Sequence, residues 1–282
     1  MTLEEILHPQ NVETLWYPAA DGSPHRILFC RPKDSLSSQK LPVFFWIHGG
    51  GWQREGPERM LPHIQYFSGC GMAAFSVEYR LSYADGPQVE DCLWDCAAAL
   101  QYLYERRENL GLDFSYLALG GDSAGGHLAC CLSCPHLLGE FHLHIPPAAC
   151  VVNCNGVIDL TMKWKEALFL SPWHNPEEWL AQYQRARKIS PIFHITAETS
   201  PTMVLHGLAD DIVEPEEGAR YAAALKNHDV PVQLKLYPDL GHAFILFDYA
   251  VENKKVFSIL HQILFYLYQQ KFPIITDDLE HS

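Results

Sequence analysis

The sequence predicts an α/β protein built on a mostly parallel β-sheet with helices on both faces. Short apolar runs alternate along the chain with longer amphipathic segments, which is the pattern of strands that alternate with helices. One run, 43–47, is uninterrupted, as expected of a strand buried on both sides. The 282 residues, of which 48% are hydrophobic and 19% charged, can form a large core of ordinary globular composition.

The predicted elements follow one another in a regular order. Helices are expected where apolar residues recur at helical spacing, and Pro215 suits the first turn of one of them because proline is tolerated there. The predicted strands are residues 25–30, 43–47, 72–77, 116–119, 148–152, 202–205 and 232–236, and the predicted helices are residues 89–106, 124–136, 215–226 and 252–270.

One region interrupts this order. Residues 160–194 carry several tryptophans among charged residues and prolines, and they do not complete a strand–helix unit. We therefore expect a single domain over 1–282, in which the insertion at about 160–194 forms a lid-like segment above the sheet.

The composition of the chain limits the binding partners and the cellular compartment that we expect. A net charge of −14 gives no electrostatic reason to bind nucleic acid or an anionic membrane. The N-terminus lacks the basic start of a secretory signal, and no apolar run approaches the ~20 residues that span a bilayer. The nine cysteines are interpreted as small core residues in a reducing compartment, since no second pair stands at zinc-site spacing with suitable histidine partners. We expect a cytoplasmic protein without metal.

The segment Gly121-Asp122-Ser123-Ala124-Gly125 fits a strained turn between a predicted strand and a predicted helix. Such a turn exposes the serine hydroxyl, and the glycines avoid collisions with the neighbouring strand and helix. The N-terminus of the following helix offers backbone N–H groups to a developing negative charge. Ser123 is therefore the candidate nucleophile.

A second glycine-rich segment, His48-Gly49-Gly50-Gly51-Trp52, directly follows the strand at 43–47. Three glycines leave backbone N–H groups uncovered and let the chain approach a ligand closely, as an oxyanion hole requires. We assign the donors to the N–H groups of Gly50, Gly51 and Ala124.

An acid and a base follow the last two predicted strands. Asp210 lies after the strand at 202–205, and His242 lies after the strand at 232–236. The serine, the acid and the histidine follow one another along the chain in the order that is usual when such a triad is built on a parallel α/β sheet. The ends of parallel strands converge in space, so these three residues can meet. Asp211 and Glu214 are the alternatives to Asp210, whereas His48, His127 and His206 are the alternatives to His242 and are expected to be structural.

Each residue type suits a step of acyl transfer. A serine hydroxyl needs a base, a histidine can take its proton and return it to the leaving group, and a carboxylate can hold that histidine in the right tautomer. Two neighbouring charged residues are given structural roles: Arg80 in an ion pair supporting the glycine loop, and Asp122 as a cap or a partner of that loop.

Several motifs in order resemble one family. They are His48-Gly49-Gly50-Gly51-Trp52, Tyr79-Arg80-Leu81, Gly121 to Leu128, Ile189-Ser190-Pro191, His206 to Asp210 and Gly241-His242-Ala243-Phe244. The chain resembles the hormone-sensitive-lipase-like esterases and lipases of the α/β-hydrolase fold, and is most similar to bacterial acetyl-xylan and feruloyl esterases. The resemblance implies a mostly parallel sheet of about eight strands and neither metal nor organic cofactor. One departure is an acidic residue, Glu214, before Pro215.

The leading hypothesis is a serine carboxylesterase that hydrolyses short-acyl esters through an acyl-enzyme. Acetylated carbohydrates are one candidate substrate, because Trp52, Trp173 and Trp179 could stack on a sugar or aromatic ring. The expected partner is thus a small-molecule or oligosaccharide ester. The alternatives are an arylformamidase or peptidase of the same fold, and a non-catalytic ligand receptor.

Overall fold

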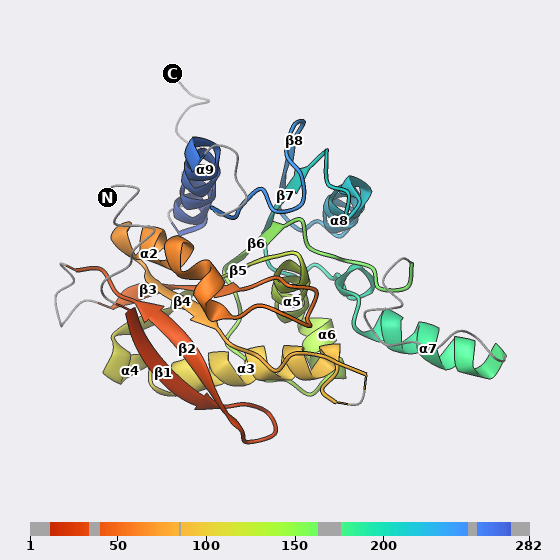
Figure 1. Cartoon of the computed structure of the whole chain (residues 1–282), viewed down its shortest axis with the longest axis horizontal. Coiled ribbons are helices and arrows are strands. Elements are labelled where there is room, and N and C mark those ends of the chain that lie inside the picture. The colour runs from red at the N-terminus through yellow and green to blue at the C-terminus, as the bar shows by residue number, and fades with distance from the viewer. Residues whose placement is uncertain (1–11, 34–39, 85, 163–175, 248–252, 272–282) are drawn as a thin grey trace, which may run out of the picture.

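An eight-stranded sheet forms the centre of the molecule, with strand order β1-β2-β4-β3-β5-β6-β7-β8 (Figure 1). The computed structural model describes residues 12–33, 40–84, 86–162, 176–247 and 253–271. β1 and β2 are antiparallel, β2 is antiparallel to β4, and every other neighbouring pair is parallel. The predicted mostly parallel sheet of about eight strands is confirmed, and so is the α/β-hydrolase fold.

The elements have the following bounds. The strands are β1 (Val12–Pro18), β2 (Pro24–Cys30), β3 (Leu41–Ile47), β4 (Ala73–Val77), β5 (Leu112–Asp122), β6 (Cys150–Cys154), β7 (Thr202–Gly207) and β8 (Val232–Tyr237). The α-helices are α2 (Leu61–Gly69), α3 (Val89–Glu105), α4 (Arg107–Leu110), α5 (Ala124–Leu132), α6 (Pro135–Glu140), α7 (Pro176–Lys188), α8 (Pro215–Asn227) and α9 (Asn253–Lys271), and two short 3₁₀ turns are η1 (Pro57–Met60) and η3 (Pro191–Phe193).

The prediction of one helix over 124–136 is wrong. α5 ends at Leu132, and α6 begins at Pro135. Cys134 between them is extended, with φ −102° and ψ 101°, because the residue before a proline is disfavoured in the helical region. β5 is longer than the predicted 116–119, and β1, most of whose residues are exposed at the sheet edge, lies outside the predicted strands.

Two hydrophobic cores lie on the two faces of the sheet. Along β3, Val43, Phe45 and Ile47 join one core, whereas Phe44 and Trp46 join the other. Apolar residues of α3, α5 and α8 pack into the first core, and those of α2 and α9 into the second. Each buried strand is therefore apolar on both sides, which explains the uninterrupted run at 43–47.

The carboxyl ends of β5, β6, β7 and β8 lie side by side, because these four strands are parallel neighbours. The segments that follow them carry Ser123, Asn155, Asp210 and His242 in this order. The topology thus gathers at one sheet edge residues that are far apart in sequence. Among the described helices, none is both long and apolar enough to cross a membrane.

Candidate active site

Ser123 occupies a strained turn between β5 and α5. Its φ is 54° and its ψ −121°, a conformation that non-glycine residues seldom adopt. A Cβ on Gly125 would come within 2.0 Å of the Ile47 carbonyl oxygen, and one on Gly121 within 2.3 Å of the Gly125 backbone. Only glycine at both positions allows the strand and the helix to approach closely enough for this turn.

Three predicted site residues come together in a chain of hydrogen bonds. Nε2 of His242 lies 2.9 Å from Oγ of Ser123. Nδ1 of His242 lies 2.8 Å and 3.0 Å from the two carboxylate oxygens of Asp210. If Nδ1–H donates to Asp210, Nε2 carries the lone pair and can accept the proton of Ser123. The arrangement can therefore generate an alkoxide-like nucleophile at neutral pH.

Asp210, rather than Asp211, faces His242. Asp210 is 7% exposed, and its Oδ1 accepts hydrogen bonds from the N–H groups of Ile212 and Val213 at 3.0 Å and 2.9 Å. Asp211 and Glu214 are exposed. The tight turn after β7 thus folds the first carboxylate inward and leaves the next ones at the surface.

The charge of Asp210 is strongly stabilised. Burial by itself would raise the pKa of Asp210, but hydrogen bonds from His206 and His242 outweigh it and hold that pKa well below its usual range. Nε2 of His206 lies 3.3 Å from Oδ2 of Asp210 and 3.0 Å from the Val213 carbonyl oxygen. The carboxylate therefore lies between two imidazoles, a contact of His206 that the sequence did not reveal.

The glycine loop after β3 lies against the nucleophile. Gly50, Gly51 and Trp52 have φ values of 107°, 62° and 60°, which turn the loop sharply. A Cβ on Gly49 would come within 3.2 Å of Cβ of Ser123. In the described part of the chain, no acceptor is found for the N–H groups of Gly50, Gly51 and Ala124. These amides are available to a developing oxyanion.

Asp122 and Tyr79 hold this loop in place. Gly49 N–H donates to Oδ1 of Asp122 at 3.1 Å, and the Tyr79 hydroxyl donates to the His48 carbonyl oxygen at 2.9 Å. Burial raises the pKa of Asp122 despite its favourable contacts. The loop is thus pinned from both sides by buried polar groups, which suits preorganised donors.

Arg80 supports the loop from further away. Its guanidinium lies 2.7 Å from the buried Asp95 and 3.1 Å from Asp21 in the β1–β2 turn. Two residues along, Ser82 N–H donates to the Trp52 carbonyl oxygen at 2.7 Å. The ion pair therefore fixes the segment that borders the glycine loop and does not reach Ser123.

Two buried histidines beside the site are structural. His127 on α5 donates from Nε2 to the Ile189 carbonyl oxygen at 2.7 Å, and His48 bonds the Gly49 carbonyl oxygen at 2.7 Å. Burial lowers the pKa of each to about 4, partly opposed by these hydrogen bonds. Both rings are neutral at neutral pH, and in the described part of the chain their side-chain hydrogen bonds go to groups other than the Ser123 hydroxyl.

Acid should destabilise the fold through these two histidines. Their folded-state pKa of about 4 lies below the ordinary value, so between the two the unfolded chain binds more protons. Stability should fall by about 1.4 kcal/mol per pH unit for each histidine as the pH drops from about 6.5 to about 4. Urea unfolding over this interval measures the slope. His127→Gln should reduce it by about half, and a flat dependence in the parent would contradict the assignment.

The prediction that Trp52 binds substrate does not agree with its position. Trp52 is 1% exposed and belongs to the core beneath the sheet edge. Its Nε1–H donates to Nδ1 of His127 at 3.2 Å, and the two rings meet edge to face. Trp173 lies outside the described residues, as does the side chain of Trp179, which belongs to α7.

Trp52→Phe should lower stability without changing substrate affinity. The variant removes the donor to His127 and leaves a buried ring nitrogen unsatisfied, which costs about 1–3 kcal/mol of unfolding free energy. KM for a small ester should stay within about 2-fold, since no binding contact is removed. Chemical denaturation measures the unfolding free energy, and steady-state kinetics measure KM. A large rise in KM at unchanged stability would restore Trp52 as a binding residue.

Asn155 is the neighbour of this site that sequence reasoning missed. Its Nδ2 lies 3.0 Å from Nδ1 of His242. The sequence feature that could have identified Asn155 is its position directly after β6. This strand lies between β5, which leads to Ser123, and β7, which leads to Asp210. No motif marks the position.

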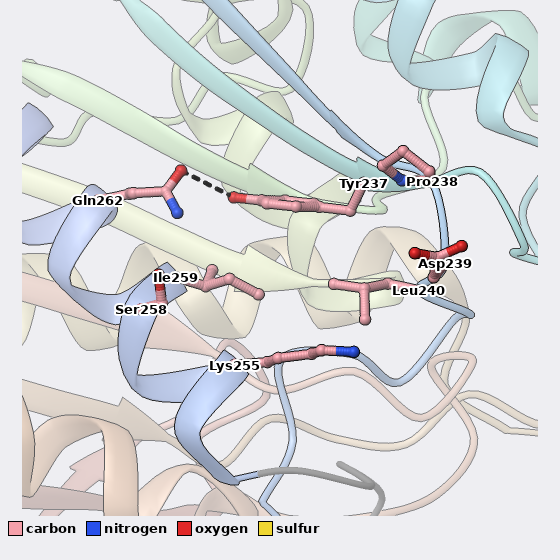
Figure 2. Close-up of a pocket in the computed structure, with 8 residues that line it drawn as sticks. All are labelled: Tyr237, Pro238, Asp239, Leu240, Lys255, Ser258, Ile259 and Gln262. Atoms are coloured by element: carbon pink, nitrogen blue, oxygen red, sulfur yellow. Dashed lines mark hydrogen bonds between the residues drawn. The ribbon is translucent and has the colours of Figure 1, made fainter.

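A separate cavity lies behind the loop that carries His242. Figure 2 shows it between the end of β8, residues 238–240 and α9. Its volume is about 240 Å³. The hydroxyl of Tyr237 donates to Oε1 of Gln262 at 3.2 Å across it. Ser123 and His242 do not line this cavity. Within the described residues, no group of three or more possible metal ligands is present.

Comparisons with known proteins agree with this fold. Residues 32–225 match the BD-FAE family model. The AB hydrolase superfamily protein C1039.03 of Schizosaccharomyces pombe is 25% identical, with 90% of this chain and 79% of that protein covered. Esterase LipQ of Mycobacterium tuberculosis is 25% identical over 86% of this chain, which spans 59% of LipQ. The butyrate-bound structure of the Thermogutta terrifontis esterase Est2 has a TM-score of 0.76 at 25% identity, with 91% and 94% of the two chains covered.

Fold and site together define a serine hydrolase of the α/β-hydrolase fold. The family model spans well over half of the sequence. The chain belongs to the BD-FAE family.

Proposed function

We propose that the protein is a carboxylesterase that hydrolyses short-acyl esters through a covalent acyl-enzyme on Ser123. The observation that carries the proposal is the chain of hydrogen bonds from Ser123 Oγ through His242 to Asp210, with lengths of 2.9 Å and 2.8 Å. A hydroxyl, an imidazole and a buried carboxylate in this order are suited to acyl transfer. The relatives named as esterases support the ester bond as the target.

The reaction follows from these contacts. Oγ of Ser123 attacks the ester carbonyl while Nε2 of His242 takes its proton, and Asp210 stabilises the imidazolium that forms. The N–H groups of Gly50, Gly51 and Ala124 receive the oxyanion. His242 then returns the proton to the leaving alcohol, and the acyl group stays on Ser123. Water loses a proton to Nε2 of His242 and attacks the acyl carbonyl. The bond from this carbon to Oγ then breaks, His242 returns the proton to Oγ, and the acid leaves Ser123 restored.

We propose that the acyl group is short. More specifically, we propose that it is an acetyl group carried by a carbohydrate. The Thermogutta esterase holds butyrate, a four-carbon acid, which supports the short acyl chain. The resemblance to acetyl-xylan and feruloyl esterases supports the carbohydrate. Trp173 and Trp179 remain the aromatic candidates for stacking on a sugar, since Trp52 is buried.

We also propose that residues 160–194 form a lid-like insertion in a single domain. α7 lies in this range, and its last turn is attached to α3: Arg185 lies 2.6 Å from Glu90. The Ile189 carbonyl oxygen then accepts the hydrogen bond of His127 beneath the nucleophile turn. The insertion is thus joined directly to the elements that hold Ser123.

A cytoplasmic location is proposed from the cysteines. All nine are free thiols, and eight are buried. Buried thiols that never pair are typical of a reducing compartment.

A substrate panel tests the proposal. It comprises p-nitrophenyl esters of increasing acyl length, acetylated xylo-oligosaccharides, feruloyl esters, N-formylkynurenine and aminoacyl-arylamides. We expect kcat/KM to be highest for the acetyl to butyryl esters and acetylated sugars to be turned over. Preference for the formamide or the arylamides would identify an arylformamidase or a peptidase instead. Absence of turnover on the whole panel, together with an unreactive Ser123 towards a fluorophosphonate, would favour a ligand receptor.

A further inference from the structure

Asn155 is placed between the strands that carry the nucleophile and the acid. It directly follows β6, which lies between β5 and β7. The Ser123 N–H donates to the Cys154 carbonyl oxygen at 2.9 Å, and the Asn155 N–H donates to the Leu205 carbonyl oxygen at 2.8 Å. The backbone around Asn155 is therefore bonded to both neighbouring strands at the point where each turns into the site.

The backbone conformation at this position is selective. Asn155 has a φ of 42°, in the left-handed region that most side chains avoid. Asparagine and glycine adopt this region at lower cost than other residues. The conformation directs the side chain away from the continuing strand direction, and Asn155 is only 1% exposed. The amide is thus enclosed by the protein.

The amide lies over a face of the His242 ring. Its Nδ2 is 3.0 Å from Nδ1 and 3.5 Å from Nε2 of that ring. The two ring nitrogens direct their in-plane hydrogen bonds away from each other, towards Asp210 and Ser123. An atom this close to both can lie only above or below the ring plane. Asn155 therefore leaves both in-plane hydrogen bonds free and covers a face of the imidazole.

The oxygen of the Asn155 amide differs from the nitrogen in its contacts. Oδ1 of Asn155 is buried and has no hydrogen-bond partner in the described part of the chain. Buried acceptors without partners are rare and are tolerated where a functional demand outweighs their cost. The polar contacts that the described structure gives the Asn155 side chain are those with the His242 ring.

We propose that Asn155 is a positioning residue that sets the tilt of the His242 imidazole, so that Nε2 faces Ser123 while Nδ1 faces Asp210. This inference rests on the proposed function. His242 comes from a loop five residues beyond the end of β8, at Tyr237, and two in-plane hydrogen bonds leave rotation about the line between them unopposed. A buried amide against the ring face opposes that rotation, and misplacement by about 1 Å can cost 100-fold in rate.

Asn155→Gly removes the amide without straining the backbone, because glycine accepts a positive φ. We expect kcat on p-nitrophenyl acetate to fall about 10- to 100-fold with KM within about 2-fold, and labelling of Ser123 by a fluorophosphonate to slow equally. The thermal midpoint identifies any loss of folding. A variant that folds and keeps wild-type kcat and labelling rate would overturn the inference.

Asn155→Asp gives a second readout, which tests directly whether the side chain at this position lies against the ring. A carboxylate of the same shape over the ring stabilises the imidazolium, so the acid limb of the kcat/KM profile should move to higher pH. Asn227→Asp is the matched control, since it adds the same charge at the exposed last residue of α8 and should leave the profile unchanged. An unmoved limb in Asn155→Asp would overturn the inference. Absence of turnover and of labelling in the wild type would instead refute the proposed function.

Discussion

Ser123→Ala should lower kcat on p-nitrophenyl acetate by at least about four orders of magnitude while the protein remains folded. The hydroxyl that lies 2.9 Å from Nε2 of His242 is the atom that forms the acyl-enzyme in the proposed mechanism, and alanine has no group in its place. Alanine retains the Cβ of serine, so the strain at φ 54° is unchanged. Residual hydrolysis would come from the oxyanion donors acting on bound water.

Ser133→Ala is the matched control for this variant. Ser133 lies one residue beyond α5 and is buried, and its Oγ donates to the Cys130 carbonyl oxygen at 2.7 Å. Its removal should cost stability and leave turnover close to wild type. Fluorophosphonate labelling followed by peptide mass analysis should place the adduct on Ser123 in the control and nowhere in Ser123→Ala. Full turnover by Ser123→Ala would refute the proposed mechanism outright.

Sequence motifs predict Ser123, Asp210 and His242 because the chemistry needs a fixed residue type at each of these positions and each follows the end of a strand. Ser123 requires glycines two residues to either side for steric reasons, so the turn leaves a pattern that can be recognised. Asp210 and His242 are less marked, but each follows a predicted strand. The parallel order of β5 to β8 then brings all three to one edge.

The roles of Trp52 and Asn155 were not predicted correctly, because they depend on burial and on contacts between segments that are distant in sequence. Trp52 follows a glycine loop and looks free to meet a ligand, yet its left-handed backbone turns the indole into the core towards His127. Asn155 contacts a ring that is 87 residues away in sequence. The α5–α6 break is different, because Pro135 carries a local signal that the apolar pattern across 124–136 obscured.

Asp210→Asn should lower kcat by about 10⁴-fold, second only to the loss of Ser123. The carboxylate accepts Nδ1–H of His242 at 2.8 Å, whereas an amide can turn its NH₂ towards the ring and favour the tautomer protonated on Nε2. A ring protonated on Nε2 cannot take the proton of Ser123. Asp211→Asn, one residue along and exposed, removes the same charge and should retain activity within about 2-fold.

The pH dependence separates this tautomer effect from a simple loss of charge. The hydrogen bonds of His206 and His242 keep the pKa of Asp210 below its ordinary value, so its contribution to stability is complete above that ordinary value of about 4 and is lost only as the pH falls through the lower folded-state pKa. Asp210 therefore stays ionised throughout the neutral range and does not set the acid limb of the kcat/KM profile. Raising the pH should consequently not rescue Asp210→Asn. If Asp211→Asn lost activity while Asp210→Asn retained it, Asp211 and not Asp210 would be the acid that pairs with His242.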